Sequence, residues 1–497
     1  MPEPATAPAT CRTWLACLGF FLVAFGVRLL WVDQYANATP YWDQWDAEAA
    51  SPLKSWLEGH LTLSEMFAAH DEHRLFTFRV LAIALLELNN RIWNPLLEMA
   101  VNAGLYAGTM ALFAGYGMRL CRRERLPLFL VGTLLVTCIP FDYDDILGGF
   151  NSQYYFLILF SLLFLWLLAR TEPLRPAWWG GLLAGVLATF SMASGVLAPL
   201  AGAGLYLLQW LRGLGRDRAS LISAVAFLAA TAVVVKTTLG ASSLAIEVQH
   251  PQSLGELFYS LNLVATWPFL PLIPVLCLLL NLPWFLFAAG LLRQPPPRRD
   301  PAWFLLACGG WVLLQFGALA YARGATPLLS RYKNVIVMGP LVNLLCLAAL
   351  PALAGWQGWL RQRLLVVWPV LMALGLVVGS LGLAGGMEAR HRDALVQETR
   401  LRAYLVEGQP LRIDDLAYFA RPYPSASMLK GYLDDPTIHA FLPPNILPAN
   451  GPREVWWARL WLAHLAASGW LLVVVGSAAL LRFLAGYWRR QPGQAEG

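Results

Sequence analysis

The chain has 497 residues, of which 58% are hydrophobic and only 13% are charged, and its mean hydropathy is +0.54. A soluble protein carries about 25% charged residues, so this composition excludes a soluble enzyme and predicts a protein that crosses a membrane many times. The net charge of +6 says little by itself, and we expect no nucleic-acid partner.

Apolar runs long enough, or nearly long enough, to cross a bilayer recur along the whole chain. The twelve runs are Trp14–Trp31, Leu96–Met118, Leu126–Pro140, Tyr154–Leu168, Trp178–Ser191, Val196–Leu211, Ala219–Leu239, Pro268–Leu292, Ala302–Ala320, Val335–Leu353, Leu364–Ala384 and Leu460–Leu484. The first run is not followed by a small-residue cleavage site, so we expect it to stay as a helix. The predicted fold class is therefore an all-α polytopic membrane protein with about twelve transmembrane helices.

The charges of the loops predict the orientation of these helices. With the N-terminus inside, the loops on the inner side are basic, as in "RLCRRERLP" and "RTEPLRP", whereas the opposite loops carry "DQWDAE" and "DYDD". Positive charge concentrates in short cytoplasmic loops. We therefore predict a protein of the bacterial inner membrane, with both termini in the cytoplasm and its acidic face in the periplasm.

The predicted organisation is a transmembrane module followed by a small hydrophilic segment and one more helix. Its parts are a module over residues 1–384 that includes a first periplasmic loop over 32–95, a periplasmic segment over 385–459, a final helix over 460–484 and a cytoplasmic tail over 485–497. The Pro-rich stretch "PYPSASMLKGYLDDPTIHAFLPPNILP" predicts that the periplasmic segment is a small ordered cap and not an independent domain.

The first periplasmic loop is expected to contain short amphipathic helices. The stretches Ala47–Gly59 and Leu61–Ala69 each suit a helix that lies on the membrane surface. The next stretch, Leu75–Leu88, is apolar but short and carries Arg79. A span there would invert all later loops and break the charge pattern, so we expect this stretch outside the membrane.

Two carboxylates follow the first span in the stretch "TPYWDQWDAEAASP". Asp43 and Asp46 are three residues apart, and on a helix they would share one face. A carboxylate held among rings near a membrane surface has a raised pKa and can act as a general base. The alternative is a solvated loop, because Trp and Tyr are enriched at that depth in any membrane protein.

A second acidic cluster lies in the short loop "PFDYDDILGGFNSQYY". Its candidate residues for binding an acceptor hydroxyl or a divalent cation such as Mg²⁺ or Mn²⁺ are Asp142, Asp144, Asp145, Asn151 and Gln153. The alternative is that outer loops are acidic because positive charge is kept inside. That alternative explains the sign of the charge but not its clustering.

Basic residues break the charge pattern in "YARGATPLLSRYKN", on the side predicted to be periplasmic. Arg323, Arg331 and Lys333 lie there, and Arg binds phosphate bidentately while Lys binds it as a point charge. The stretch "AAHDEHRLFTFR" lacks the helical spacing of a zinc protease motif, which argues against a zinc site. Its residues His73 and Arg74 are instead further candidates for binding the phosphate of a lipid-linked donor. The alternatives are snorkelling to lipid headgroups and a solvated loop.

Carboxylates in the early loops and cations in a later loop are what sugar transfer from a lipid phosphate requires, because a base takes the acceptor proton and cations stabilise the departing phosphate. In this layout the chain resembles the GT-C superfamily of integral-membrane glycosyltransferases. The resemblance covers Trp14 to about Leu353 and rests on the motifs "YWDQWD", "DYDD", "HDEHR", "FNSQYY" and "ARG…SRY".

The resemblance implies that Asp43 or Asp46 is the catalytic base of an inverting displacement. It also implies a polyprenyl-phosphate sugar donor and a lipid or glycan acceptor such as lipopolysaccharide. Members of the superfamily place surface helices in the first loop, and some have further acids in the second. The superfamily usually has a larger soluble C-terminal domain or none, whereas the segment 385–459 is of modest size.

Two other functions compete with this one. A transporter or flippase of lipid-linked sugars would place charges or broken helices near mid-membrane, and "FSMASGVLAP" and "WPFLPLIPVL" suit broken helices. An O-antigen polymerase or ligase would also use outer Arg residues. Charge reversal of Arg323 or Arg331 would damage all three functions, whereas loss of Asp43 or Asp46 would be fatal chiefly to the glycosyltransferase.

Overall fold

The computed structural model describes residues 10–239, 249–269, 275–324, 326–350, 358–448 and 454–488. These residues form helices almost throughout. The strands among them are β1 (Ala69–His70) and β2 (His73–Arg74), which pair as a short antiparallel hairpin in the first loop.

Nine helices in the described ranges are long and apolar enough to cross a membrane, as the predicted all-α membrane class requires. They are built on α1 (Thr10–Tyr35), α5 (Pro95–Met118), α8 (Ser152–Arg170), α10 (Leu197–Leu211), α11 (Arg218–Leu239), α16 (Ala302–Arg323), α18 (Met338–Ala349), α19 (Gly358–Ser380) with its continuation α20 (Leu383–Leu405), and α24 (Leu465–Trp488).

The predicted count of twelve spans stays a prediction. The other three apolar runs fall on shorter helices, namely α6 (Leu126–Cys138), α9 (Pro176–Thr189) and the pair α14 (Val275–Leu280) and α15 (Leu282–Arg293). The 13 residues of α6 rise by about 20 Å, which is less than the roughly 30 Å thickness of a hydrocarbon core.

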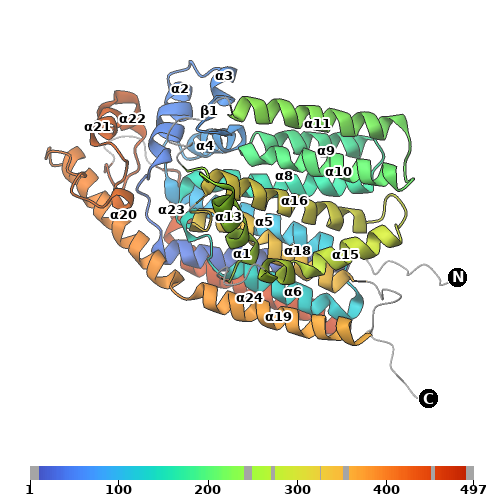
Figure 1. The fold of residues 1–497 in the computed structure, drawn as a ribbon. Coiled ribbons are helices and arrows are strands. Elements are labelled where there is room, and N and C mark those ends of the chain that lie inside the picture. The colour runs from blue at the N-terminus through green and yellow to red at the C-terminus, as the bar shows by residue number, and fades with distance from the viewer. Residues whose placement is uncertain are drawn as a thin grey trace.

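Short elements connect these helices and gather mainly at one end of the bundle. They are η1 (Gln44–Leu53), α2 (Lys54–Leu57), α3 (Leu63–Met66), α4 (Phe76–Leu88), η2 (Arg123–Arg125), α7 (Tyr143–Ile146), η3 (Gly149–Asn151), η4 (Ala193–Val196), α13 (Leu254–Thr266), η5 (Ser330–Tyr332), α17 (Lys333–Ile336), η6 (Tyr418–Ala420), α21 (Ala426–Asp434), α22 (Pro436–Phe441) and α23 (Trp456–Ala463). Figure 1 shows α2, α3, α4, α21 and α22 together at the same end of the molecule.

The first loop, residues 32–95, and the segment over 385–459 share one hydrophobic core at that end. We call the second of these the late segment. Buried side chains of the first loop, including Trp45 and Trp93, pack in one cluster with buried side chains of the late segment, including Leu401, Leu429 and Phe441. Segments this short bury too little apolar surface to be stable alone. The late segment is therefore a cap that folds onto the first loop.

The helices of the first loop differ from the expected surface helices. The stretch Ala47–Gly59 is not one helix, because the backbone is extended at Ser51, directly before Pro52, and separates η1 from α2. The residue before a proline is disfavoured in helical conformation. Most of η1 is buried, so it lies inside the end of the molecule and not on its surface.

The rest of the first loop is explained by local hydrogen bonds. In the stretch Leu61–Ala69 only α3 is helical, and Thr62 with Glu65 forms a capping box at its start. Arg79 of α4 donates to the backbone oxygens of Glu65, at 2.9 Å, and Ala68, at 2.7 Å. With 13 residues, α4 is shorter than a typical bilayer span, and its place outside the membrane stays a prediction.

The late segment begins and ends inside helices. The predicted boundary at residue 385 lies within α20, which continues from α19 out of the bundle (Figure 1). The predicted final helix is divided at His464 into α23 and α24. Most of the predicted tail, residues 489–497, lies outside the described residues.

The first and last helices pack antiparallel through glycines. Gly26 of α1 faces Gly469 of α24, and Gly19 faces Gly476. A Cβ atom on Gly26 would lie 2.5 Å from the backbone oxygen of Gly469, which is closer than atoms of a side chain and a backbone can approach. The two backbones are therefore in direct contact at two places along the pair.

Candidate functional site

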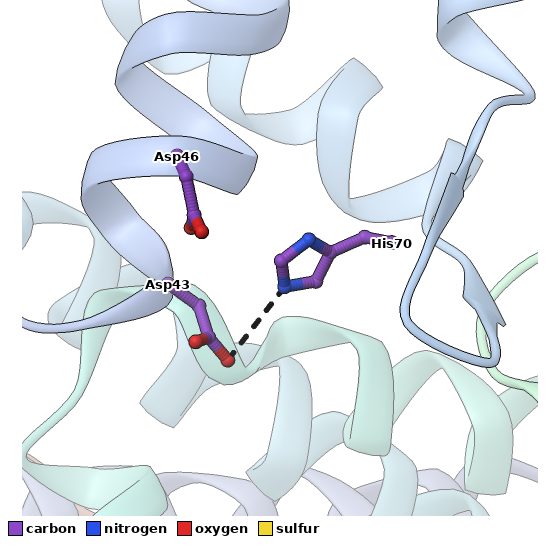
Figure 2. A group of neighbouring side chains, drawn as sticks. All are labelled: Asp43, Asp46 and His70. Carbon is purple, nitrogen blue, oxygen red and sulfur yellow. Dashed lines mark ion pairs between the residues drawn. The ribbon is translucent and has the colours of Figure 1, made fainter. Parts of the chain in front are cut away.

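Asp43, Asp46 and His70 converge at the start of η1, as Figure 2 shows. One possible ligand atom of each lies within 4.8 Å of the others. The Nε2 atom of His70 is 3.9 Å from Oδ2 of Asp43, which is an ion-pair distance and too long for a hydrogen bond. Asp43 caps η1 and Asp46 lies in its first turn, so the three-residue spacing brings both carboxylates to one place.

The two carboxylates differ in their surroundings. Asp46 accepts a hydrogen bond from the Tyr423 hydroxyl at 3.0 Å and another from the backbone N–H of Ala47 at 2.8 Å. Burial raises the pKa of Asp46, His70 and Tyr423 oppose that rise, and Asp43 adds to it. The side chain of Asp43 is 42% exposed. Asp43 is therefore the open carboxylate and Asp46 the restrained one.

The β1–β2 hairpin holds His70 against η1. Its ring packs edge-to-face on Phe150, with centroids 6.0 Å apart. Burial alone would lower the pKa of His70, but Asp43 and Asp46 outweigh burial, and the pKa is raised. The two carboxylates therefore favour the protonated form of this imidazole more than water would.

Asp142, from the second acidic cluster, is bound to an internal arginine. The Nη2 atom of Arg28 in α1 donates to its two carboxylate oxygens at 2.8 and 2.9 Å, and the guanidinium lies 3.4 Å from the ring centroid of Tyr106. Arg28 is 1% exposed and Asp142 is 3% exposed. This geometry ties α1 to the second loop, and the predicted role of Asp142 in binding an acceptor or metal stays a prediction.

The other members of that cluster are also mostly engaged inside the protein. Asp145 is buried and accepts from the side-chain amide of Asn334 at 2.5 Å, and burial, aided by the neighbouring carboxylates, raises its pKa well above the usual range. The Asn151 amide donates to the backbone oxygen of Asp144 at 3.2 Å. Gln153 is buried, and its Oε1 atom has no hydrogen-bond partner among the described residues.

Asp144 faces a group of cations. Its backbone N–H donates to Ser330 Oγ at 3.1 Å, which brings η5 and α17 next to the second loop. Burial raises the pKa of Asp144, and the charges of Arg390, Arg331 and Lys333 oppose that rise. We call these three residues the cation group.

The cation group lacks close anionic partners. In the described parts of the chain, no carboxylate oxygen lies within 4.0 Å of any of its three charges. Arg331 interacts electrostatically with Asp43 and Asp144 at longer range. The guanidinium of Arg390 lies 3.8 Å from the ring centroid of Tyr41, and its Nη1 atom is buried without a hydrogen-bond partner in the structure as described.

The remaining predicted phosphate ligands have close partners within the protein. Arg323 forms an ion pair with Glu72 at 2.6 Å and donates to the Tyr332 hydroxyl at 2.6 Å, while His73 lies 3.7 Å from the same Glu72. Burial would raise the pKa of Glu72, but His73 and Arg323 outweigh burial and lower it. Arg74 donates to the backbone oxygen of Phe67 at 2.9 Å. The guanidiniums of Arg323 and Arg331 lie 5.6 and 5.3 Å from the ring centroid of the same Tyr332, so these two residues differ in their partners and not in their region of the structure, and the phosphate-binding role of all of them stays a prediction.

An apolar cavity of about 220 Å³ lies between this ion pair and the membrane helices. Side chains of α8, α10 and α16 form its apolar wall, and Glu72, Arg323, Tyr154 and Tyr332 lie at its polar parts. The guanidinium of Arg331 lies 5.3 Å from the ring centroid of Tyr332. The cavity and the cation group are therefore separated by little more than one aromatic ring.

A pair of buried carboxyl groups fixes η1 to α5. The Trp93 indole donates to Glu48 at 2.9 Å and to Glu98 at 3.1 Å, and the Gln44 amide donates to both at 3.1 Å. Burial raises the pKa of Glu48, which favours a proton between two carboxyl groups that share their donors. Gly149 packs against this pair, since a Cβ atom there would lie 2.2 Å from Glu98 Oε2. The hydrogen bonds of Glu48 and Glu98 therefore position η1, the helix that carries Asp46.

Sequence reasoning missed two residues of the site, Arg390 and Tyr423, which both come from the late segment. Arg390 follows an apolar run at the end predicted to be periplasmic, so the same break in the charge pattern that drew attention to Arg323 could have found it. Tyr423 and Asp46 are 377 residues apart. No local pattern predicts that contact.

A divalent cation would fit the Asp43 cluster better than the second loop. The cluster offers two carboxylates and an imidazole whose Nε2 atom has no hydrogen-bond partner among the described residues. In the second loop Asp142 is bound to Arg28 and Asp145 to Asn334. An imidazole ligand suits Mn²⁺ better than Mg²⁺, which prefers oxygen ligands.

No protein-family model matches the chain, and no curated protein and no solved structure is detectably similar to it. The resemblance to the GT-C superfamily therefore rests on short motifs and their layout. A function has to be argued from the geometry of the site.

Proposed function

We propose that the chain is a membrane glycosyltransferase that moves a sugar from a polyprenyl-phosphate donor to the hydroxyl of a lipid or glycan acceptor. One observation carries the proposal. The open carboxylate of Asp43 and the cation group lie in one site, and an apolar cavity adjoins it. A base, a phosphate-binding group and an apolar groove are the three parts that this reaction needs.

The reaction would be a single displacement at the anomeric carbon of the donor sugar. Asp43 takes the proton of the acceptor hydroxyl as its oxygen attacks that carbon, and the bond to the phosphate oxygen breaks on the opposite face, with inversion. The transition state has oxocarbenium character. The cation group stabilises the charge that develops on the departing lipid phosphate, because its unpaired donors can turn to the phosphate oxygens.

The other residues of the site have supporting roles in this proposal. Asp46 is held by Tyr423 and does not exchange its partner for an acceptor hydroxyl, which makes Asp43 the base. His70 keeps the two carboxylates together. If the reaction needs a divalent cation, Mn²⁺ or Mg²⁺ bound at Asp43, Asp46 and His70 would orient the acceptor oxygen, and chelation would then abolish transfer.

The cavity supports a lipid donor. Its wall on α8, α10 and α16 is apolar, as a polyprenyl chain requires, and its polar parts carry Arg323 beside Glu72. A donor that enters here would bring its phosphate to the ring of Tyr332 and then to Arg331. The proposal places this face in the periplasm of a bacterial inner membrane, where lipid-linked sugars are exposed.

The experiment is sugar transfer by purified protein in nanodiscs. Radiolabelled polyprenyl-phosphate hexoses and a lipopolysaccharide extract are the substrates, and wild type is compared with Asp43→Asn and Asp46→Asn. Asp33→Asn is the matched control, because Asp33 is an exposed carboxylate in the last turn of α1, the helix that precedes Asp43. We expect Asp43→Asn to abolish transfer, Asp46→Asn to weaken it and Asp33→Asn to leave it unchanged.

The same preparation tests the competing functions. In liposomes, a fluorescent polyprenyl-phosphate sugar that changes leaflet without being transferred would identify a flippase and contradict the proposal. A product that grows by repeated units would identify a polymerase. Transfer that survives Asp43→Asn would show that Asp43 is not the catalytic base.

A further inference from the structure

Four aromatic rings from two distant parts of the chain meet beside Asp43. Tyr41 and Trp42 directly precede Asp43, and Tyr418 and Phe419 belong to η6 of the late segment. The ring of Trp42 is stacked on Phe419 at an interplanar angle of 14° and meets Tyr418 edge-on, with centroids 5.5 and 5.2 Å away. We call these four residues the aromatic platform.

Backbone hydrogen bonds hold the platform in place. The Tyr41 hydroxyl donates to the backbone oxygen of Phe419 at 2.8 Å, and the Trp42 indole donates to that of Arg421 at 3.1 Å. The backbone N–H of Trp42 donates to Pro422 at 2.8 Å. Trp42 has a φ of 50°, in the left-handed region that bulky residues rarely adopt and that occurs most often at functional sites.

The outer rings of the platform face outward. Phe419 is 70% exposed and Tyr418 is 53% exposed, although the hydrophobic core shared by the first loop and the late segment lies close by. Rings that served only to attach the two segments would be expected to turn into that core. Contiguous exposed aromatic surface indicates a binding site.

The two rings of the platform that belong to η6, Tyr418 and Phe419, lie farther out along α20 than Arg390 of the cation group, whose guanidinium contacts the ring of Tyr41 at 3.8 Å. The Gln397 amide donates to the backbone oxygen of Ala420, the last residue of η6, at 3.0 Å. Gln397 comes seven residues after Arg390 on α20, which runs away from the bundle (Figure 1). Seven residues of helix rise by about 10 Å. The exposed rings of η6 therefore lie outward from Arg390, whereas side chains of the membrane helices form the apolar wall of the cavity.

We infer that the aromatic platform binds a sugar ring of the acceptor. A pyranose ring has a face of C–H groups that stacks on aromatic faces, and its hydroxyls point sideways, where Asp43 is the adjacent open carboxylate. The electron-rich faces of aromatic rings disfavour a phosphate. The inference deepens the proposed function by naming the acceptor as a glycan, and it rests on that function for the role of Asp43.

Two measurements test the inference independently of each other. The first is saturation-transfer NMR of methyl glycosides of glucose, galactose and mannose with the protein in nanodiscs. The second is the acceptor KM of transfer to the lipopolysaccharide extract. The variants are Phe419→Ala and Phe419→Leu, and Phe258→Leu is the matched control, because Phe258 is an exposed Phe on α13, which contributes nothing to the platform.

We expect both Phe419 variants to lose the glycoside signal and to raise the acceptor KM about tenfold, the size of one aromatic contact, with the donor KM unchanged. The control should match wild type in both measurements, and thermal melting should show that all variants are folded. Leucine keeps an apolar side chain but lacks a stacking face. If Phe419→Leu behaved like wild type while Phe419→Ala failed, the rings would be an anchor in the lipid headgroup region and the inference would be wrong.

The two proposals fail in distinguishable ways. If glycoside binding depends on Phe419 but no donor gives transfer, the platform is a glycan-binding site and the proposed glycosyltransferase activity is contradicted. If transfer depends on Asp43 but is unchanged in Phe419→Leu, the proposed enzyme activity is supported and the sugar-binding role of the platform is contradicted. Absence of glycoside binding to wild type would also overturn the platform.

Discussion

The ion pair between Arg28 and Asp142 gives the most direct test of how this structure is stabilised. Both groups are almost completely buried, and the guanidinium binds both carboxylate oxygens. Removing one partner of such a pair leaves a buried charge without compensation, which costs about 3–5 kcal/mol. Because 1.36 kcal/mol corresponds to a factor of ten, Arg28→Met or Asp142→Asn should raise the unfolded-to-folded ratio by a factor of roughly 150 to 5,000.

The double variant Arg28→Met with Asp142→Asn removes both charges together. The side-chain amide that replaces the Asp142 carboxylate can still accept from the Tyr155 hydroxyl, which lies 3.3 Å from Asp142 in the native protein. Replacing a buried ion pair by uncharged groups of similar volume is often close to neutral. We therefore expect the double variant to recover at least about 2 kcal/mol relative to either single variant.

The assay is unfolding by SDS in mixed micelles, followed by tryptophan fluorescence and circular dichroism at constant total detergent. A cost below about 1 kcal/mol for either single variant, or a double variant whose cost equals the sum of the two, would refute the reasoning. Sugar transfer by the double variant also separates two roles of Asp142. Activity would identify Asp142 as a structural carboxylate, whereas inactivity at normal stability would favour its predicted role in binding an acceptor or a metal.

Three further predictions concern single residues. Tyr423→Phe removes a hydroxyl that lowers the pKa of Asp46, so that pKa rises. Because Asp46 supports the base Asp43 in the proposed function, the acid limb of the pH–rate profile should move to higher pH, and an unmoved acid limb would show that the charge of Asp46 has no role in transfer. The pKa of Asp145 is raised in the folded state, so its contribution to stability is fullest at low pH and is lost as the pH rises above the pKa of the unfolded state. Asp145→Asn should therefore lessen the fall in melting temperature towards neutral pH. An unchanged pH dependence of the melting temperature would contradict this. Gly149→Ala places a methyl group against Glu98 and should cost about 1–3 kcal/mol, measured by the SDS titration above, whereas a cost near zero would mean that the carboxyl pair is free to move.

The helical class and the early carboxylates could be predicted from the sequence because both depend on local patterns. Apolar runs of about 20 residues report spans directly, and a three-residue spacing places Asp43 and Asp46 on one face of a helix. The burial of η1 could not be predicted in this way. It depends on the cap, whose residues enter the same core from the far end of the chain.

The sequence predicted that a group of cations exists at this end of the molecule more readily than it predicted which residues form it. The charge pattern drew attention to Arg323, Arg331 and Lys333 together, but Arg323 pairs with Glu72 from the first loop, a contact that no periodicity encodes. Arg390 takes its place beside Asp144. Sequence showed that cations lie on the acidic side, and tertiary packing decides which of them remain free of a carboxylate partner.

The glycine contacts between α1 and α24 have a consequence for how the protein is made. The glycine face of α1 leaves the ribosome before its partner α24 is synthesised, because most of the described helices lie between the two in the sequence. Until then, the insertion machinery, lipid or another helix must cover the surface around Gly19 and Gly26. The packing of α1 is therefore completed only once α24 has been inserted, and a chain interrupted before α24 would present to the quality-control proteases an α1 helix with an unfilled groove.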